Sequence, residues 1–151
     1  MKISYFLVLL LACILTFVQT EHVFSQTQSE AIEAEIVEVP GGSYRNILPE
    51  QLSSMLKKKD FLFINVHIPY EGEIEKTDLF IPYEEMEQNL NKLPADKESK
   101  IVIYCRTDRM SIIAVRTLVK LGYKNVWNLK GGMTAWRQAG YPLIEKSMKD
   151  Q

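Results

Sequence analysis

The chain alternates short runs of apolar residues with longer stretches in which apolar residues recur at helical spacing. The runs at 61–66 and 101–104 are almost continuously apolar, as strands buried on both faces require. Further short strands are expected at 44–47, 79–81 and 126–128. The apolar positions at 36–39 are compatible with one more.

Four segments place apolar residues on one helical face. The first begins at Pro49, which suits the first helical position. The second spans 83–93, the third follows residue 105 and ends near 121, and the fourth spans 133–139. Strands that alternate with helices predict an α/β fold of three layers, a mainly parallel sheet with helices on both faces. Ligands of such sheets bind beyond the C-terminal ends of the strands.

The first 25 residues have a different character from the rest. Lys2 precedes an apolar run at 3–18, and a polar stretch then ends at Ser25. A positive charge, an apolar middle and a small residue at the cut site are typical of a secretory signal, so we expect cleavage after Ser25 and export, to the periplasm or beyond. Residues 26–43 are polar and acidic and are expected to link the signal to a domain at 44–148.

Two alternatives for the N-terminal segment rank lower. Lipidation at Cys13 would anchor the protein. However, the apolar run continues past Cys13, and a lipoprotein signal would not need this continuation. An uncleaved anchor ranks last, because the run is shorter than the roughly 20 residues of a full membrane span. After cleavage we expect no stable embedding in a membrane.

Composition and charge fit one ordinary globular domain. The 151 residues are 46% hydrophobic and 25% charged. The net charge of −1 provides no global basic field for nucleic acid or anionic lipid, so any anion must be bound by a local arrangement. Without the signal segment, the one histidine and one cysteine that remain cannot form a zinc site.

Cys105 lies where an expected buried strand ends and a helix begins. The N–H groups of a helix N-terminus favour negative charge, and Arg106 and Arg109 add to the positive field. These effects favour the thiolate, which is the reactive form. The alternative is a small apolar core residue, since buried cysteines are common. After signal cleavage Cys105 has no disulfide partner, and an unpaired thiol in an oxidising compartment suggests a use for it.

Two segments resemble the signatures of single-domain rhodaneses, which are sulfurtransferases. The loop at 105–111 is similar to the family's Cys-Arg-Ser/Thr-Gly-x-x-Ser cradle. Residues 129–136 with 140–142 resemble its Gly-Gly-x-x-x-Trp…Gly-x-Pro ending. The resemblance covers roughly residues 44–145 and implies a rhodanese-like fold that needs no metal or organic cofactor.

The resemblance also implies a two-step reaction. The Cys105 thiolate attacks the outer sulfur of an anionic donor such as thiosulfate and becomes a persulfide, and a thiol or cyanide then removes that sulfur. Backbone N–H groups of the loop can surround an anionic sulfur, and its two arginines can hold sulfonate-like oxygens. The candidate substrate-binding residues are Arg106, Thr107, Asp108, Arg109, Met110 and Ser111.

Asp108 departs from the glycine that the family usually carries. A tight cradle wants a positive φ at this position, which aspartate tolerates. Its carboxylate would repel an anionic donor if it pointed inward, and would pair with Arg106 or Arg109 if it pointed outward. We therefore expect weak handling of thiosulfate and a gain of activity in Asp108→Gly.

The first half of the domain departs further from the family. Asn65 and His67 stand where rhodaneses usually have Asp-x-Arg. His67 is a candidate for a supporting hydrogen bond or, less favoured, for a general acid or base. The acidic residues Glu71, Glu73 and Glu75 are expected to form a solvated loop beside the mouth of the site.

Three functions compete on this evidence. The first is an exported sulfurtransferase that acts through Cys105. The second is a weak or inactive rhodanese-like module that binds a protein partner or a small anion. A phosphatase is set aside, because that chemistry wants an arginine six positions after the cysteine, where Ser111 stands.

Overall fold

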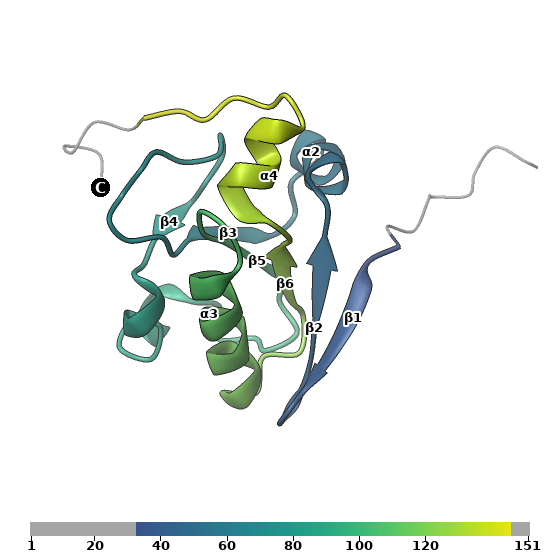
Figure 1. The fold of residues 1–151 in the computed structure, drawn as a ribbon. Coiled ribbons are helices and arrows are strands. Elements are labelled where there is room, and N and C mark those ends of the chain that lie inside the picture. Colours follow the sequence, from purple (N-terminus) through teal and green to yellow (C-terminus); the bar gives the residue numbers. More distant parts are fainter. Residues whose placement is uncertain (1–32, 146–151) are drawn as a thin grey trace, which may run out of the picture. The chain divides into compact units, whose positions relative to one another are not determined.

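A six-stranded sheet forms the centre of the chain in a computed structural model that describes residues 33–145 (Figure 1). In this part of the chain, three α-helices and two 3₁₀ turns (η) accompany the strands, and the last helix follows the last strand. In chain order the elements are β1 Glu35–Val39, β2 Gly42–Ile47, α2 Pro49–Lys57, β3 Leu62–Asn65, β4 Leu79–Phe80, η1 Tyr83–Glu85, η2 Leu90–Lys92, β5 Ile101–Tyr104, α3 Arg109–Lys120, β6 Val126–Leu129 and α4 Gly132–Gln138.

The strands run in the order β1-β2-β6-β5-β3-β4. All neighbouring pairs are parallel except β1 and β2, which form an antiparallel hairpin. The C-terminal ends of β3, β5 and β6 therefore meet at one edge, where the loop that begins with Cys105 lies. The α/β fold with a mainly parallel sheet is confirmed, and β5 is central and fully buried, as its apolar sequence predicts.

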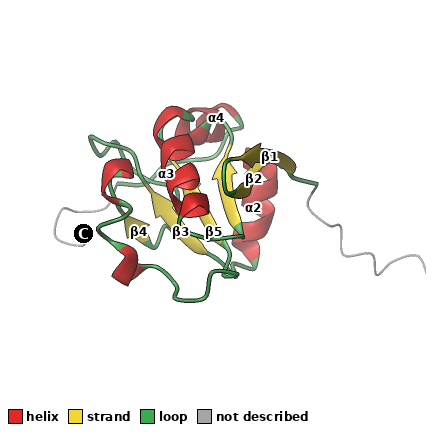
Figure 2. Ribbon diagram, turned by 90° about the horizontal axis from the view of Figure 1, so that it is seen from below, coloured by secondary structure: helices red, strands yellow, loops and turns green. Residues whose placement is uncertain are grey.

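Helix α3 covers one face of this sheet (Figures 1 and 2). Its buried positions follow the spacing of a single helical stripe. They are Ser111, Ala114, Val115, Leu118 and Val119. The helix ends before Gly122, whose φ of +87° is one that glycine adopts without strain.

The side chains that α2 and α4 bury are separate from the cluster on the α3 side of the sheet, which includes Ile103, Cys105 and Leu118. Leu52 and Leu56 come from α2 and Trp136 from α4, while Phe63 and Tyr104 come from the sheet and lie with ring centroids 4.8 Å apart. Because successive strand residues point to opposite faces, Tyr104 lies on this side and its neighbour Cys105 on the α3 side.

The sheet begins earlier in the chain than the linker assignment of 26–43 implies. The strand considered at 36–39 is present as β1, and the turn around Gly41, with φ of +96°, returns the chain into β2. Val37 and Val39 pack against the α3-side cluster, which gives this strand a reason to join the sheet. The expected signal at 1–25 and Cys13 lie outside the described residues.

The prediction of a helix at 83–93 is wrong. The segment instead forms η1 and η2, which are separate 3₁₀ turns. The side-chain amide of Asn89 donates to the Glu85 carbonyl at 2.9 Å, the acceptor that the Asn89 backbone N–H would use in an α-helix. Leu90 is also too exposed to continue a buried stripe. Within residues 33–145 no helix combines the length and apolarity needed to cross a bilayer.

Candidate active site

Cys105 follows β5 directly, at the C-terminal edge of the sheet. It is a free cysteine, and its side chain packs in the buried cluster beneath α3 with 1% of its surface exposed. The sulfur is therefore a buried group at the start of a loop. Its burial agrees with the core alternative, while its polar neighbour does not.

That polar neighbour is the hydroxyl of Ser111, which is itself fully buried in the first turn of α3. Its Oγ lies 3.5 Å from Cys105 Sγ and donates to the carbonyl oxygen of Asp108 at 3.2 Å. The thiol proton therefore points to the serine oxygen. Once the thiol loses that proton, the hydroxyl can rotate and donate to the sulfur.

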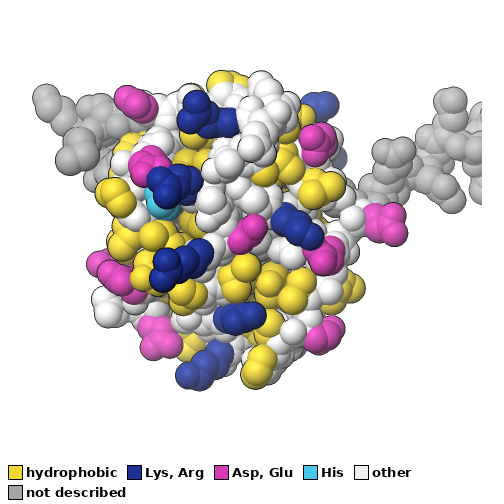
Figure 3. Space-filling view, viewed as in Figure 1, with side chains coloured by type: hydrophobic (Ala, Val, Ile, Leu, Met, Phe, Trp, Pro, Cys, Tyr) yellow, Lys and Arg dark blue, Asp and Glu magenta, His cyan; other side chains and the backbone are white. Residues whose placement is uncertain are grey.

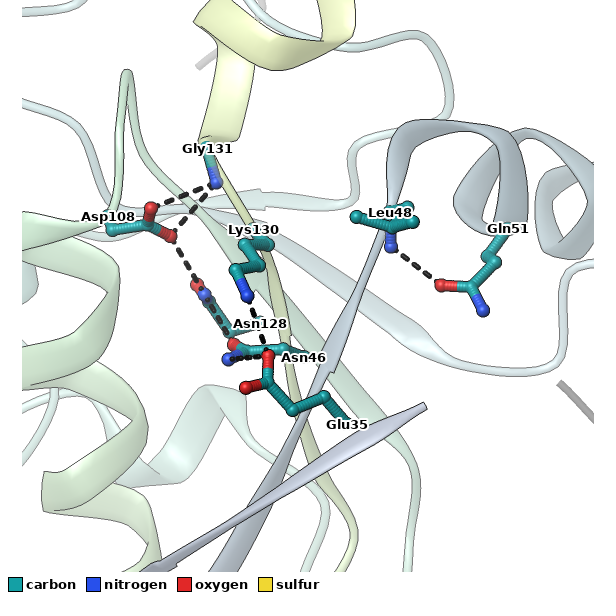
Figure 4. Close-up of polar contacts among 8 residues, drawn as sticks. All are labelled: Glu35, Asn46, Leu48, Gln51, Asp108, Asn128, Lys130 and Gly131. Carbon is teal, nitrogen blue, oxygen red and sulfur yellow. Dashed lines mark hydrogen bonds and ion pairs between the residues drawn. The ribbon is translucent and has the colours of Figure 1, made fainter. Parts of the chain in front are cut away.

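Asp108 does not behave as its sequence position suggested. Its φ of −129° is negative, so the loop forms without the left-handed conformation that the glycine pattern predicted. Its carboxylate pairs with neither Arg106 nor Arg109. It accepts hydrogen bonds from the backbone N–H of Gly131 and the side-chain amide of Asn128, so the expected pairing with a loop arginine is wrong (Figure 4).

The turn into α4 supports the loop from the same side. The N–H groups of Met133 and Thr134 donate to the carbonyls of Cys105 and Arg106, both at 2.9 Å. Gly132 makes this approach possible, because a Cβ there would lie 2.2 Å from the Cys105 carbonyl oxygen. The second glycine of the Gly-Gly pair is thus required by close packing against the loop.

The arginines of the loop lie toward solvent. Arg106 is 58% exposed in its side chain and pairs with Glu71 at 3.0 Å, so part of its charge is neutralised. Arg109 is exposed at the start of α3, Thr107 is exposed, and Met110 is half-buried. On the face that Figure 3 shows, positive and negative side chains are interspersed.

His67 is buried beside this ion pair, with 4% of its surface exposed. Its Nε2 lies 3.3 Å from the Glu71 carboxylate, but neither ring nitrogen makes a hydrogen bond. The hydrogen bonds at this strand end come instead from Asn65, which accepts from the His67 N–H and donates to the Gly72 carbonyl. The neutral side-chain amide of Asn65 therefore holds the backbone that follows β3 in place. Glu73 is buried, unlike the solvated residue expected.

A cavity of about 360 Å³ adjoins the loop on the α4 side. Arg106 of the loop and Glu71 form part of its wall, and Arg137 of α4 adds a second guanidinium. Cys105 is not among its lining residues. Within residues 33–145 no group of three or more His, Cys, Asp or Glu side chains is arranged to hold a metal ion.

Sequence reasoning missed the partners of Asp108. Asn128 was assigned only to a strand, and Gly131 only to the start of a helix. One signal was available in the sequence, since Asn128 is a polar residue inside an otherwise apolar strand. The structure buries this residue fully. Buried polar groups of this kind need a partner, which here is the loop.

Comparison with known proteins places this geometry in a family. The sequence model of the family described as "Rhodanese-like domain" matches residues 48–139, which is more than half of the chain. The chain belongs to the rhodanese-like domain family. The match includes the Cys105 loop and the turn into α4.

Its relatives include proteins named as sulfurtransferases. A sulfurtransferase of Allochromatium vinosum is 33% identical over 99 residues, covering 63% of this chain and 90% of that protein. The thiosulfate sulfurtransferase GlpE of Coxiella burnetii is 28% identical over 96 residues, covering 62% and 88%. At the level of the family, these relatives support sulfur transfer by this rhodanese-like domain.

A solved structure agrees with the fold. A rhodanese-related protein from Thermoplasma volcanium superposes with a TM-score of 0.58 at 27% identity, covering 68% of this chain and all of that one. The sheet and helices around the loop are therefore those of a rhodanese-like domain.

Proposed function

We propose that this chain is a sulfurtransferase that carries the transferred sulfur as a persulfide on Cys105. The observation that carries the proposal is the pairing of Cys105 Sγ with the buried hydroxyl of Ser111 at 3.5 Å, at the C-terminal edge of a parallel sheet. A buried hydroxyl beside a lone thiol provides a donor for the anionic sulfur that the reaction requires.

The first step forms the persulfide. The Cys105 thiolate attacks the outer sulfur of thiosulfate, a sulfur–sulfur bond forms at Sγ, and sulfite leaves with the electron pair of the broken bond. The Ser111 hydroxyl and the backbone N–H groups of 106–111 would stabilise the anionic outer sulfur. Arg106 and Arg109 would attract the sulfonate oxygens, with Arg106 weakened by its ion pair to Glu71.

The second step returns the enzyme to its starting state. The thiolate of an acceptor, or cyanide, attacks the outer sulfur, and the electron pair of the Cys105 sulfur–sulfur bond returns to Sγ. No redox partner is needed, because the acceptor receives the sulfur that the donor lost. The chemistry uses no metal or organic cofactor, and we propose no nucleic-acid partner.

The burial of Cys105 favours a second candidate, a rhodanese-like module that binds a protein or a small anion without turnover. With 1% of the residue exposed, a donor reaches the sulfur only if the loop leaves a path to it. Persulfide formation separates the two candidates, since it requires contact between donor and sulfur.

The test is intact mass spectrometry of the protein without its signal segment after incubation with thiosulfate. We expect one added sulfur, lost again on addition of cyanide or a thiol, and no adduct in Cys105→Ser. If no sulfane donor adds sulfur to the wild-type protein, the enzymatic proposal fails and the binding module is favoured.

A further inference from the structure

The carboxylate of Asp108 fastens the reactive loop to the strand and helix that follow it. Oδ1 accepts from Asn128 Nδ2 at 3.1 Å and from the Gly131 N–H at 3.0 Å, and Oδ2 lies 3.0 Å from the same N–H (Figure 4). We call these three residues the Asp108 latch. A carboxylate that accepts hydrogen bonds from N–H donors is held more firmly than a neutral acceptor.

The latch holds one end of the loop and α4 holds the other. Met133 and Thr134 donate to the carbonyls of Cys105 and Arg106, so the loop is fixed at its first two residues and again at Asp108. Only Thr107 lies between these points, and its carbonyl faces Gly132. The path of the backbone around the thiol is thereby set from one side.

The backbone of Asp108 passes this constraint to Ser111. The Asp108 carbonyl oxygen accepts from Ser111 Oγ at 3.2 Å and from the Ile112 N–H at 2.8 Å. Ser111 Oγ in turn lies 3.5 Å from Cys105 Sγ. A shift of Asp108 would therefore move the first turn of α3, from which the Ser111 hydroxyl reaches the sulfur.

We infer that Asp108 is a positioning residue for sulfur transfer, in which its carboxylate, through the latch, holds the Ser111 hydroxyl and the loop in the arrangement that the Cys105 thiolate needs. The inference rests on the proposed function. It reverses the expectation from sequence, since removal of Asp108 should lower activity. The carboxylate oxygens are directed at the amide donors of Asn128 and Gly131.

Four substitutions separate position from charge. Asp108→Asn removes the charge and the second acceptor of the Gly131 N–H, Oδ2, but keeps Oδ1, which receives both donors. Asp108→Glu keeps the charge but displaces the carboxylate by one methylene. Asp108→Ala removes both properties, and Asp96→Ala removes an exposed loop carboxylate elsewhere as the matched control.

The experiment measures persulfide formation against thiosulfate concentration by intact mass spectrometry. We expect Asp108→Ala and Asp108→Glu to lower the maximal rate about tenfold, as for the loss of a hydrogen bond to a charged group. The half-saturating thiosulfate concentration should stay within about twofold, because a positioning residue does not touch the donor. Asp108→Asn should stay within about threefold of wild type, and Asp96→Ala should match it.

A second readout needs no sulfur donor. The rate of Cys105 alkylation by iodoacetamide, measured across pH, compares the reactivity of the thiol in each folded variant. A displaced Ser111 hydroxyl would move this profile to higher pH in Asp108→Ala and Asp108→Glu and leave it in place in Asp108→Asn. Removal of a repelling charge would instead move the profile to lower pH in both Asp108→Ala and Asp108→Asn.

Three results would overturn the inference: faster loading in Asp108→Ala, equal losses in Asp108→Asn and Asp108→Glu, or a lowered melting temperature with unchanged rate and pH profile. If Asp108→Ala does not fold, the comparison of Asn with Glu still decides. If wild-type protein forms no persulfide, the proposed function fails, and the alkylation profiles alone decide whether the latch positions the thiol.

Discussion

At the residue scale, Tyr104 is the neighbour of Cys105 in the chain, but its side chain makes its hydrogen bonds on the opposite face of the sheet. Its hydroxyl accepts from the Ile74 N–H at 3.0 Å and lies 2.8 Å from Thr77 Oγ1. Since Thr77 donates its own proton to the Ile74 carbonyl at 2.7 Å, Tyr104 donates to Thr77. The tyrosine thereby holds the segment between β3 and β4 against β5.

Burial raises the pKa of the Tyr104 hydroxyl above its ordinary value. A phenol whose pKa is raised on folding contributes stability that is fully present below its unfolded pKa of about 10 and is lost as pH rises beyond it. We predict that Tyr104→Phe costs about 1–3 kcal/mol of unfolding free energy at neutral pH, because the Ile74 N–H and Thr77 lose their partner.

Urea unfolding at several pH values tests this prediction. The difference between wild type and Tyr104→Phe should shrink above pH of about 10, because only the wild type has this buried hydroxyl to ionise. Tyr83→Phe, at a half-buried tyrosine, is the control. A difference that stays constant through the alkaline range would contradict the assignment.

The residues that the sequence allowed us to predict are those whose partners are close in the chain. Cys105 and Ser111 lie in one loop and its following turn, and their spacing brings the sulfur and the hydroxyl together. The orientation of Asp108 could not be predicted, because its partners come 20 and 23 residues later. A local pattern contains no information on which donors a fold brings to a carboxylate.

At the element scale, the junction of β6 and α4 packs closely against the backbone of the reactive loop. Gly132 has a φ of +55°, and a Cβ there would lie 2.2 Å from the Cys105 carbonyl oxygen and 2.4 Å from that of Thr107. Both neighbours are backbone atoms, so they cannot turn aside as a side chain would. The α4 turn and the reactive loop must move apart if residue 132 gains a side chain.

We predict that Gly132→Ala destabilises the domain far more than Gly140→Ala. Gly140 also has a positive φ, +87°, but nothing lies within 4 Å of a Cβ placed there. The control should cost about 1–2 kcal/mol for its backbone conformation, and Gly132→Ala about 1–3 kcal/mol more for the overlap. Chemical denaturation gives both values. Equal losses would show that the loop does not press on Gly132.

Elements with a strong and continuous pattern were predictable from sequence. The apolar run of β5 and the stripe of α3 appear where they were expected. The helix expected at 83–93 failed because a side chain, Asn89, took the carbonyl that the helical backbone would use. A spacing of apolar residues does not reveal that competition.

At the scale of the whole molecule, the chain combines the described domain with an N-terminal segment whose sequence is typical of an export signal. We propose that the protein is exported and that its mature form begins at Gln26. N-terminal sequencing of protein recovered from the exported fraction should read Gln26 first. A mature chain that still begins at Met1, or one that carries lipid on Cys13, would contradict cleavage at this site.

The first strand, β1, is connected to the reactive loop by a series of polar side-chain contacts. Asn128, which donates to Asp108, also donates to Asn46 on β2, and Asn46 donates to Glu35 on β1, which further pairs with Lys130. A continuous line of polar contacts thus runs from the beginning of the sheet to the reactive loop. A displacement of β1 would therefore be passed through Asn46 and Asn128 to Asp108, so the conformation of the reactive loop depends on a strand that is far from it in the sequence.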